Sequence, residues 1–408
     1  MRVLHLNTHS SGGSHEYAVL LSTALAEQGI ESQMLSKDSQ QLQSGKLFLD
    51  RIIRKVYVSL STEPWHGTQR LLSPPCPEDL QGFDLVHLHT VADWFNVPSW
   101  LETLPSGIGV VITLHDMWHL TGGCFLYRGC DRFAETCAPC PILKTPLNRV
   151  IAKDEQRRKL RAYRSRRVQF VANSQWLADL ADCSAIVRAC GCSRVIPPGI
   201  DTEVFRPQDK AQCRAELGIP ADAFVIAAGA ASLTDINKNI PWLLEQLAGL
   251  SELEDVLVVL AGEGTLEIRI GLNVRLTGGI ADHVQRAMFY NAADVFVSAS
   301  LMETYGLTLI EAMSCGIPVV AFRTGGVPQA VPKQGGILCE LLDADAFKAA
   351  IQKLHHSEEL RNELGNAGRK LVAARNAKSR FAAAFARLYE ACPRPEQTNL
   401  VEQSALVS

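Results

Sequence analysis

Two carboxylates stand eight positions apart in the sequence, and a helix N-terminus is predicted between them. Glu303 precedes Gly306, which permits a tight turn, and Glu311 lies within Leu307 to Met313, a run of good helix formers. The outward-pointing amides that start such a helix bind anions, and here they belong to Gly306, Leu307 and Thr308. Because carboxylates accept hydrogen bonds from sugar hydroxyls strongly, the pattern indicates a nucleotide-sugar site with Glu303 at a hexose and Glu311 at a ribose. The spacing fits equally an acidic residue favoured by the helix dipole and a second, solvated glutamate.

Alternating strands and helices surround these carboxylates. The helix is expected to end at Gly316, and Ile317 to Phe322 is apolar and β-branched, as buried parallel strands are. Other predicted strands of this series lie at 224–229, 256–261, 273–276 and 295–298. The alternation predicts a parallel sheet.

A similar series occupies the N-terminal half of the chain. It begins with a strand at 2–7, a glycine loop at 10–14 and a helix at 16–28. This order cradles phosphate in doubly wound folds, although the pair Gly12 and Gly13 alone is a weak signal. The strand at 109–114 ends at His115, and ligands of open α/β sheets bind at the carboxyl ends of strands. A lone histidine at this position also fits a structural role.

Taken together, these motifs resemble the donor site of a known enzyme family. The two glutamates are followed by Ala312-Met-Ser-Cys-Gly-Ile-Pro-Val-Val320 and Gly325-Gly-Val-Pro-Gln329. The combination is similar to glycosyltransferase family 4, which consists of retaining enzymes of the GT-B fold that use nucleotide sugars. The resemblance extends from Leu6 to about Tyr389, nearly the whole chain.

The resemblance implies an α/β fold with two facing Rossmann-like, doubly wound domains and an active site in the cleft between them. Residues 1–195 would form the acceptor-side domain, completed by a C-terminal helix at about 379–391, and residues 196–378 would form the donor domain. The segment from Ser193 to Pro207 contains the predicted boundary, and residues 393–408 are polar and are expected to form a disordered tail.

The resemblance also implies roles for individual residues. The implied catalytic residues are His115, Lys238 and Glu303. The implied donor-binding residues are Gly12, Gly13, Lys238, Gly264, Thr277, Gly278, Glu303, Gly306, Leu307, Thr308 and Glu311. Lys238 would bind phosphate, and His115 would face the donor sugar. Backbone groups at the strand ends would contact the base. Because backbone contacts do not specify a base, the sequence does not distinguish a UDP-sugar donor from a GDP-sugar donor.

This chain departs from the family pattern at two places. Family members commonly carry an arginine a few residues before the phosphate-binding lysine, where this chain has Ala231 and Ser232. They usually carry asparagine before Gly199, where this chain has Pro198. Among side chains, Lys238 alone is therefore expected to stabilise the negative charge of the leaving diphosphate.

The predicted activity is the transfer of a sugar from a nucleoside-diphosphate sugar to a sugar or lipid-linked acceptor hydroxyl, in polysaccharide or glycoconjugate biosynthesis. Two alternatives stay open, namely a non-catalytic nucleotide-sugar-binding subunit and a GT-B-fold nucleotide-sugar epimerase. A pyridine-nucleotide dehydrogenase is not favoured, because Ser10 to Ser14 lacks the Gly-x-Gly-x-x-Gly pattern.

Composition and charge narrow the choice of partners and of compartment. A formal net charge of −3 gives no overall attraction to nucleic acid. No apolar run is long enough to span a membrane, and no signal peptide precedes the first strand, so we expect a cytoplasmic protein. Seven cations fall between Arg157 and Arg167, and they form either a solvated helix or a surface for anionic lipid at the inner face of the membrane.

Four cysteines lie within 17 residues, at Cys124, Cys130, Cys137 and Cys140, in a loop rich in glycine and proline. Such a loop offers little core in which to bury thiols, and a cytoplasmic chain does not favour disulfides. The spacing therefore suggests a structural zinc site, with unrelated buried thiols or an iron–sulfur cluster as the alternatives. No cofactor is expected to be required for catalysis, because the Asp343-Ala-Asp345 pair begins a predicted helix and fits an N-cap better than a metal site.

Overall fold

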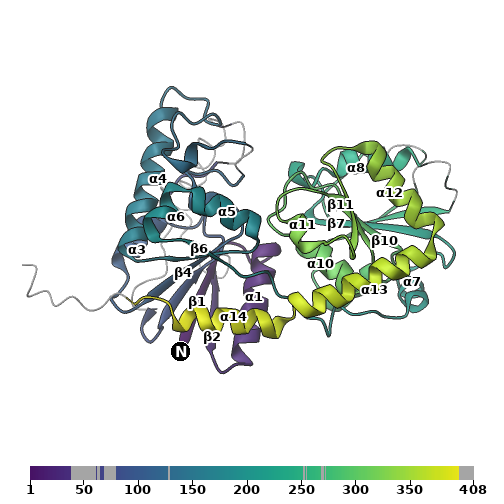
Figure 1. Cartoon of the computed structure of the whole chain (residues 1–408), viewed down its shortest axis with the longest axis horizontal. Coiled ribbons are helices and arrows are strands. Elements are labelled where there is room, and N and C mark those ends of the chain that lie inside the picture. The colour runs from purple at the N-terminus through teal and green to yellow at the C-terminus, as the bar shows by residue number, and fades with distance from the viewer. Residues whose placement is uncertain are drawn as a thin grey trace, which may run out of the picture. The chain divides into compact units, whose positions relative to one another are not determined.

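A computed structural model describes residues 1–37, 61, 65–68, 80–126, 129–250, 253, 255–267, 271 and 273–394. The chain divides into two compact units (Figure 1). The first unit comprises Met1–Ile196 and the chain from Phe381 onward, and the second comprises Pro197–Arg380. Within the part of the chain that the structure describes, no helix combines the length and the apolar character that crossing a bilayer requires.

The first unit is built on a parallel sheet with the strand order β2-β1-β3-β4-β5-β6. Its strands are β1 (Arg2–Asn7), β2 (Glu31–Ser36), β3 (Leu85–Leu88), β4 (Gly109–Leu114), β5 (Gln169–Ala172) and β6 (Ser193–Val195). Its helical elements are α1 (Gly13–Ala26), α3 (Val97–Thr103), η3 (Trp118–Leu120), η4 (Arg132–Ala134), α4 (Asn148–Ser165), α5 (Gln175–Cys183), α6 (Ala185–Cys190) and most of α14 (Lys378–Glu390).

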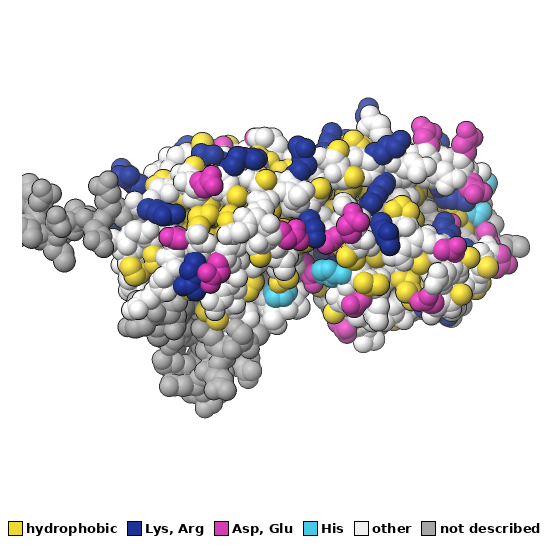
Figure 2. Space-filling model, turned by 90° about the horizontal axis from the view of Figure 1, so that it is seen from below, with side chains coloured by type: hydrophobic (Ala, Val, Ile, Leu, Met, Phe, Trp, Pro, Cys, Tyr) yellow, Lys and Arg dark blue, Asp and Glu magenta, His cyan; other side chains and the backbone are white. Residues whose placement is uncertain are grey.

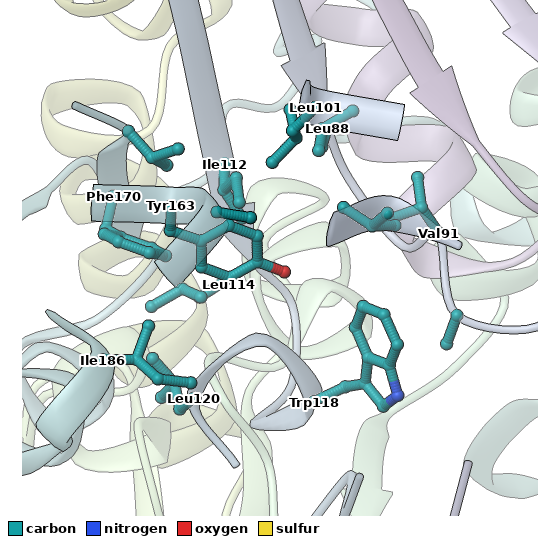
Figure 3. Packing of buried hydrophobic residues seen from close by; sticks show 14 of the residues in the cluster. Leu88, Val91, Leu101, Ile112, Leu114, Trp118, Leu120, Tyr163, Phe170 and Ile186 are labelled. Carbon is teal, nitrogen blue, oxygen red and sulfur yellow. The ribbon is translucent and has the colours of Figure 1, made fainter. Parts of the chain in front are cut away.

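Helices cover both faces of this sheet, because its strands are apolar on both sides. On one face Val3, Leu85 and Val111 pack with α1 and α14. On the other face a larger cluster joins the strands to α3, α4, α5 and α6. Figure 3 shows part of this larger cluster, with Tyr163 of α4 beside Ile112 and Leu114 of β4.

The second unit repeats the arrangement with the strand order β12-β11-β10-β7-β8-β9, again parallel. Its strands are β7 (Phe224–Ser232), β8 (Val256–Glu263), β9 (Val274–Gly278), β10 (Val295–Ser298), β11 (Val319–Phe322) and β12 (Gly336–Cys339). Its helices are α7 (Lys210–Leu217), η5 (Ile236–Lys238), α8 (Ile240–Ala248), α9 (His283–Asn291), α10 (Leu307–Ser314), α11 (Val327–Ala330), α12 (Ala344–His356) and α13 (Glu358–Arg375). Helices α8 and α12 pack on one face, and α9, α10 and α13 pack on the other.

Each strand order places a topological switch point inside its sheet. In the first unit β1 is followed by β2 on one side and by β3 on the other, so the switch lies between β1 and β3. In the second unit β7 leads to β8 on one side, and β10 lies on the other. Open α/β sheets bind ligands outside the carboxyl ends of the strands that flank such a switch.

The predicted fold class is confirmed, since both sheets are parallel and doubly wound. Three strands were not predicted from the sequence, namely β2, β6 and β12, and each lies at the edge of its sheet. Of the tail predicted at 393–408, residues 395–408 lie outside the described residues.

Candidate functional site

Lys238 and Glu303 lie at the switch point of the second sheet and form an ion pair. Lys238 ends η5, which follows β7, and Glu303 lies in the loop after β10. The Lys238 ammonium is 2.5 Å from Glu303 Oε1, with 28% of the lysine side chain and 17% of the glutamate side chain exposed. Burial by itself lowers the pKa of Lys238, but the Glu303 carboxylate outweighs it and raises that pKa above the ordinary lysine value. Lys238 is therefore a charged group at neutral pH.

The loop that carries Glu303 is held from two sides. On one side, the side-chain amide of Asn237 donates to Met302 O at 2.8 Å. On the other side, the Gly326 amide donates to Glu303 O at 2.8 Å. Gly325 has a φ of +54°, and a Cβ there would meet Glu303 O at 2.0 Å, so only glycine fits this approach. The glycine pair that sequence comparison with the family highlighted thus positions Glu303.

Helix α10 begins at Gly306, three residues after Glu303, without a side-chain cap. Gly306 has a φ of +100°, and a Cβ there would meet Leu309 Cδ1 at 2.7 Å. The helix start therefore needs glycine both for its backbone conformation and for space. Leu307 and Thr308 occupy the first turn, where amides have no intrahelical partner. The predicted anion-binding amides and Lys238 thus flank the same short loop.

Glu311 is not the solvated glutamate that the spacing also allowed. It is 9% exposed, and its carboxylate accepts from the Arg286 guanidinium at 3.2 Å and from the Tyr290 hydroxyl at 2.7 Å. Both partners lie on α9, so this contact ties α9 to α10. A carboxylate has about four acceptor positions, which leaves capacity for the predicted ribose contact.

The residues predicted to contact the base lie at the carboxyl ends of β8 and β9. Gly264 follows β8, and Thr277 and Gly278 end β9. The side chain of Thr277 donates to Leu260 O at 3.3 Å, which links the two strand ends. Gly264 and Thr277 are exposed and Gly278 is half-buried. Their backbone groups therefore lie along the same edge of the sheet that carries Lys238 and Glu303.

The first unit places Gly12, Gly13 and His115 at the carboxyl edge of its own sheet. Gly12, with a φ of +88°, precedes α1, and Gly13 is the first residue of that helix. His115 follows β4 directly, and the ring of Tyr17 from α1 packs edge-on against it with 4.8 Å between the ring centroids. Burial lowers the pKa of His115 to about 3, so its imidazole is neutral at physiological pH.

His115 ends a chain of buried histidines that sequence reasoning missed. His115 Nε2 lies 3.1 Å from His89 Nδ1, and His89 Nε2 lies 3.1 Å from His5 Nδ1. Burial lowers the pKa of His5 to about 3 and holds that of His89 well below the ordinary value. Because each neutral ring carries one N–H, the hydrogen-bond direction along the chain fixes which nitrogen of His115 is protonated. The available signal was the alternate spacing of His87 and His89 along one apolar run, with His5 in another.

The predicted zinc ligands gather around one cavity in the loop between β4 and α4. This cavity is lined by Cys124, Cys130, Cys137 and Cys140, together with Thr121, Arg132, Phe133, Pro141 and Ile142. Sequence reasoning expected a loop with little interior. The structure shows instead that Cys137 and Cys140 are buried and pack into the main core of the first unit.

The basic stretch from Arg157 to Arg167 is less exposed than predicted. Lys159 is fully buried and donates to Trp118 O at 2.5 Å and to Thr121 O at 3.1 Å. The prediction of seven surface cations is therefore wrong for Lys159, which faces the loop on the inner side of α4. The exposed members are Arg157, Arg161, Arg164 and Arg167. Figure 2 shows one face of the molecule, on which basic and acidic side chains are interspersed.

The Asp343-Ala-Asp345 pair behaves as the sequence suggested. The Asp343 side chain accepts from the Ala346 amide at 3.0 Å and caps α12. Asp345 lies in the first turn of that helix, is almost fully exposed and pairs with Lys348 at 3.2 Å. The pair is thus accounted for by helix capping.

Comparison with known proteins agrees with this geometry. Residues 11–204 match the family model described as Glycosyltransferase Family 4, and residues 224–357 match the one described as Glycosyl transferases group 1. A D-inositol 3-phosphate glycosyltransferase from Segniliparus rotundus is 34% identical over 189 residues, which is 43% of this chain and 41% of that protein. This match therefore spans less than half of the relative's length.

Two further comparisons extend over nearly the whole chain. D-inositol 3-phosphate glycosyltransferase 2 from Catenulispora acidiphila is 27% identical over 94% of this chain and 90% of its own length. The crystal structure of Anabaena HepE in complex with UDP-glucose superposes with a TM-score of 0.62 and 17% identity, covering 96% of this chain and 100% of that one. The likeness to HepE shows the fold, which is GT-B. With both sheets, both switch points and both family matches in place, the chain belongs to the group 1 glycosyl transferases of glycosyltransferase family 4.

Proposed function

We propose that this chain transfers a glycosyl group from a nucleoside-diphosphate sugar to an acceptor hydroxyl and retains the anomeric configuration. The observation that carries the proposal is the Lys238–Glu303 ion pair at the switch point of the second sheet, beside the uncapped start of α10. A cation and free amides suit a diphosphate, and a carboxylate suits sugar hydroxyls. The complex of HepE with UDP-glucose supports a uridine donor.

In the proposed reaction the bond between the anomeric carbon and the diphosphate oxygen breaks. A bond from the same carbon to the acceptor oxygen forms on the same face, and the acceptor proton passes to the leaving diphosphate. Negative charge therefore develops on the diphosphate, where preorganised donors contribute most. Lys238 and the amides of Leu307 and Thr308 supply these donors, and Glu303 orients both the sugar and the lysine.

The ion pair also has a cost for substrate binding. Lys238 is already satisfied by Glu303 at 2.5 Å, so a diphosphate must share the ammonium with that carboxylate. An ammonium has three donors and can bridge both anions. Glu303 in turn can use its second oxygen for a hexose hydroxyl. The pair thus holds Lys238 in place before the donor arrives.

A hydrolysis screen against UDP- and GDP-sugars tests the proposal, because release of the nucleoside diphosphate reports donor recognition without knowledge of the acceptor. We expect one donor to be cleaved slowly by the native chain. Lys238→Ala should lower that cleavage about 10²-fold. Lys348→Ala, which removes a partly exposed lysine of the same unit, should leave it unchanged. Absence of binding and of cleavage across the panel would refute the donor assignment.

The acceptor is proposed to be a sugar or a lipid-linked hydroxyl compound at the inner face of the membrane. Two relatives act as D-inositol 3-phosphate glycosyltransferases, which favours a hydroxylated and anionic acceptor. Arg157, Arg161 and Arg164 follow one another along one stripe of α4 and are exposed. Each could contribute about 1 kcal/mol near an anionic leaflet. The described cysteines are free thiols, which suits a reducing, cytoplasmic compartment.

Sedimentation with vesicles of phosphatidylserine and phosphatidylcholine tests the membrane contact. Binding should fall at high salt and in the triple variant Arg157→Gln, Arg161→Gln and Arg164→Gln. A control with Arg323→Gln, in the second unit, should bind as the native chain does. Equal partition of native and triple variant would show that this stripe is only a solvated helix face.

A further inference from the structure

The long connection between β4 and α4 brings four cysteines to one place. Cys124, Cys130, Cys137 and Cys140 come from different parts of the loop and line a single cavity with the ring of Phe133 and with Ile142. About 20 Å³ of this cavity is open to the centre of a water-sized sphere, which is the space of one small ion or water. Four cysteines lining so small a space fit a metal ion better than an organic ligand.

Backbone amides point at two of the sulfur atoms. The Gly122 amide donates to Cys137 Sγ at 3.1 Å. The amides of Ile142 and Leu143 donate to the sulfur of Cys140. Amide donors of this kind orient thiolate ligands and offset their charge in metal sites. Cys137 and Cys140 are the two residues of the Cys-x2-Cys pair, so both of its sulfurs are held in this way.

Two cations face the same loop. Arg132 lines the cavity, and the buried Lys159 holds the carbonyl oxygens of Trp118 and Thr121 with its ammonium. A zinc ion with four thiolates carries a net negative charge, which a buried site must compensate. Lys159 and Arg132 supply that compensation. Lys159 also faces the carboxylates of Glu155 and Asp116, so its charge is shared among these groups.

The loop is also tied to the helix behind it. The Cys137 amide donates to the side-chain oxygen of Gln156 at 2.8 Å, and the side-chain nitrogen of Gln156 donates to Phe133 O at 2.8 Å. On the other side, the Met117 amide donates to Phe125 O at 3.0 Å. Met117 lies two residues after His115. A fixed loop therefore also fixes the chain that leaves His115.

We propose that Cys124, Cys130, Cys137 and Cys140 bind one structural Zn²⁺ that holds the loop between β4 and α4. The sulfurs of Cys124 and Cys140 are already in hydrogen-bond contact. In a tetrahedral zinc site with Zn–S bonds of about 2.3 Å, neighbouring sulfurs lie about 3.8 Å apart. Among these described cysteines, no three sulfurs lie within 4.8 Å of one another, so zinc binding requires them to draw together. Rotation about χ1 moves a cysteine sulfur without moving its backbone.

A second group of buried ligand atoms is not assigned a metal. Among the described residues, the ring nitrogens of His5, His87 and His89 are the group of three that lie within 4.8 Å of one another. His87, however, uses one nitrogen for the Tyr389 hydroxyl and the other for the Thr113 hydroxyl, each at 2.7 Å. His5 and His89 are joined to each other at 3.1 Å. These nitrogens therefore serve hydrogen bonds, whereas the cysteine sulfurs surround a cavity.

Elemental analysis of the full chain, purified without added metal, tests the proposal. We expect about one zinc per chain. Cys130→Ser and Cys137→Ser should each lower the zinc content at least about tenfold, because three thiolates hold zinc far less tightly than four. The matched control is Cys183→Ser, which removes an exposed cysteine of the same unit and should leave the zinc content unchanged.

Reconstitution with Co²⁺ keeps the test decisive if a cysteine variant does not fold. Native chain that is unfolded with a chelator and refolded with Co²⁺ should show the intense visible bands of tetrahedral thiolate coordination, and added Zn²⁺ should abolish them. The proposal is overturned by zinc-free, stable native protein, by a Cys124–Cys140 disulfide in its mass spectrum, or by iron and sulfide in place of zinc. Unchanged zinc content in Cys137→Ser would overturn it as well.

Discussion

The two units share one topology but place opposite chemistry at their switch points. In the second unit the switch point carries a largely buried ion pair, Lys238 and Glu303. In the first it carries neutral imidazoles, namely the buried His89 directly after β3 and the half-buried His115 directly after β4. The carboxyl edge of the second sheet thus carries charged groups, while that of the first carries neutral hydrogen-bonding rings. The same strand order thus leaves the chemistry to the few residues after each strand.

The largest expected effect comes from removing the charge of the second unit. Lys238→Ala should lower the rate of donor cleavage by about 10²-fold, since loss of one preorganised donor to a developing oxyanion has that size. The measurement is kcat for cleavage of the donor found in the screen, with Lys348→Ala as control. A loss of less than about threefold would mean that the amides of α10 stabilise the diphosphate without Lys238. The difference in charge between the two switch points would then not contribute to catalysis.

The next effect is the loss of stability that the buried histidines of the first unit should cause as the pH falls. Their pKa values are depressed below the unfolded value, so the unfolded chain binds more protons and stability falls as pH drops below about 6.5, down to the folded pKa of about 3 for His5 and His115. Each such histidine should lower the free energy of unfolding by about 1.4 kcal/mol per pH unit in this window.

Hydrogen exchange followed by mass spectrometry at pH 5 and pH 7, corrected for intrinsic rates, can resolve the two units. The first unit should lose protection at pH 5 relative to the second, whose described histidines are not buried. Lys238 of the second unit has no such effect at acidic pH. Because its pKa is raised in the folded state, its contribution to stability is present below the unfolded lysine pKa and is lost only at strongly alkaline pH. Equal acid sensitivity of both units would break the comparison.

A smaller effect is expected at Glu311. Glu311→Gln keeps the shape of the side chain but removes the charge that pairs with Arg286 and accepts from Tyr290. We expect KM for the donor to rise about tenfold with kcat nearly unchanged, because a hydrogen bond to a charged group contributes about 1.5 kcal/mol. A tenfold fall in kcat without a change in KM would instead show that Glu311 stabilises the transition state rather than the bound donor.

No effect is expected from a chelator. Lys238 and the helix amides are proposed to hold the diphosphate without a divalent ion, so EDTA should leave the transfer rate unchanged. Zinc content should be measured in the same sample, because a closed four-cysteine site exchanges slowly and must stay loaded for a fair comparison. Activity that is lost in EDTA and restored by Mg²⁺ or Mn²⁺ would show that the second unit does not supply enough positive charge.

The sequence predicted most of the central strands, because a strand buried on both faces is a continuous apolar run. Val295–Ser298 and Gly109–Leu114 were predicted with the bounds that the structure has. The edge strand β2, with the sequence Glu-Ser-Gln-Met-Leu-Ser, carries no such run and was missed. In the second unit the spacing of Glu303 and Glu311 around a glycine turn was visible locally. The pairing of Glu303 with Lys238 joins residues 65 positions apart and has no local signal.

The histidine chain shows the same limit more strongly. His5, His89 and His115 come from three separate strands, and their contacts follow from the strand order, which is not readable from spacing. The burial of Lys159 was also hidden, since seven cations within eleven positions look like a solvated surface unless the side facing the cysteine loop is known. In each case the missing information was tertiary.

Helix α14 has a consequence for how the chain is made. Tyr389 closes a hydrogen bond to His87 at 2.7 Å, 302 residues away, and Phe381, Phe385 and Leu388 cover one face of the first sheet. A ribosome produces residues 1–196 long before it reaches this helix. Until then the face formed by Val3, Leu85 and Val111 is covered by α1 but not by α14, and a partly uncovered apolar sheet face attracts other chains. The first unit therefore completes its core only at the end of synthesis, and a stop codon before Phe381 would leave an aggregation-prone fragment although both family motifs were intact.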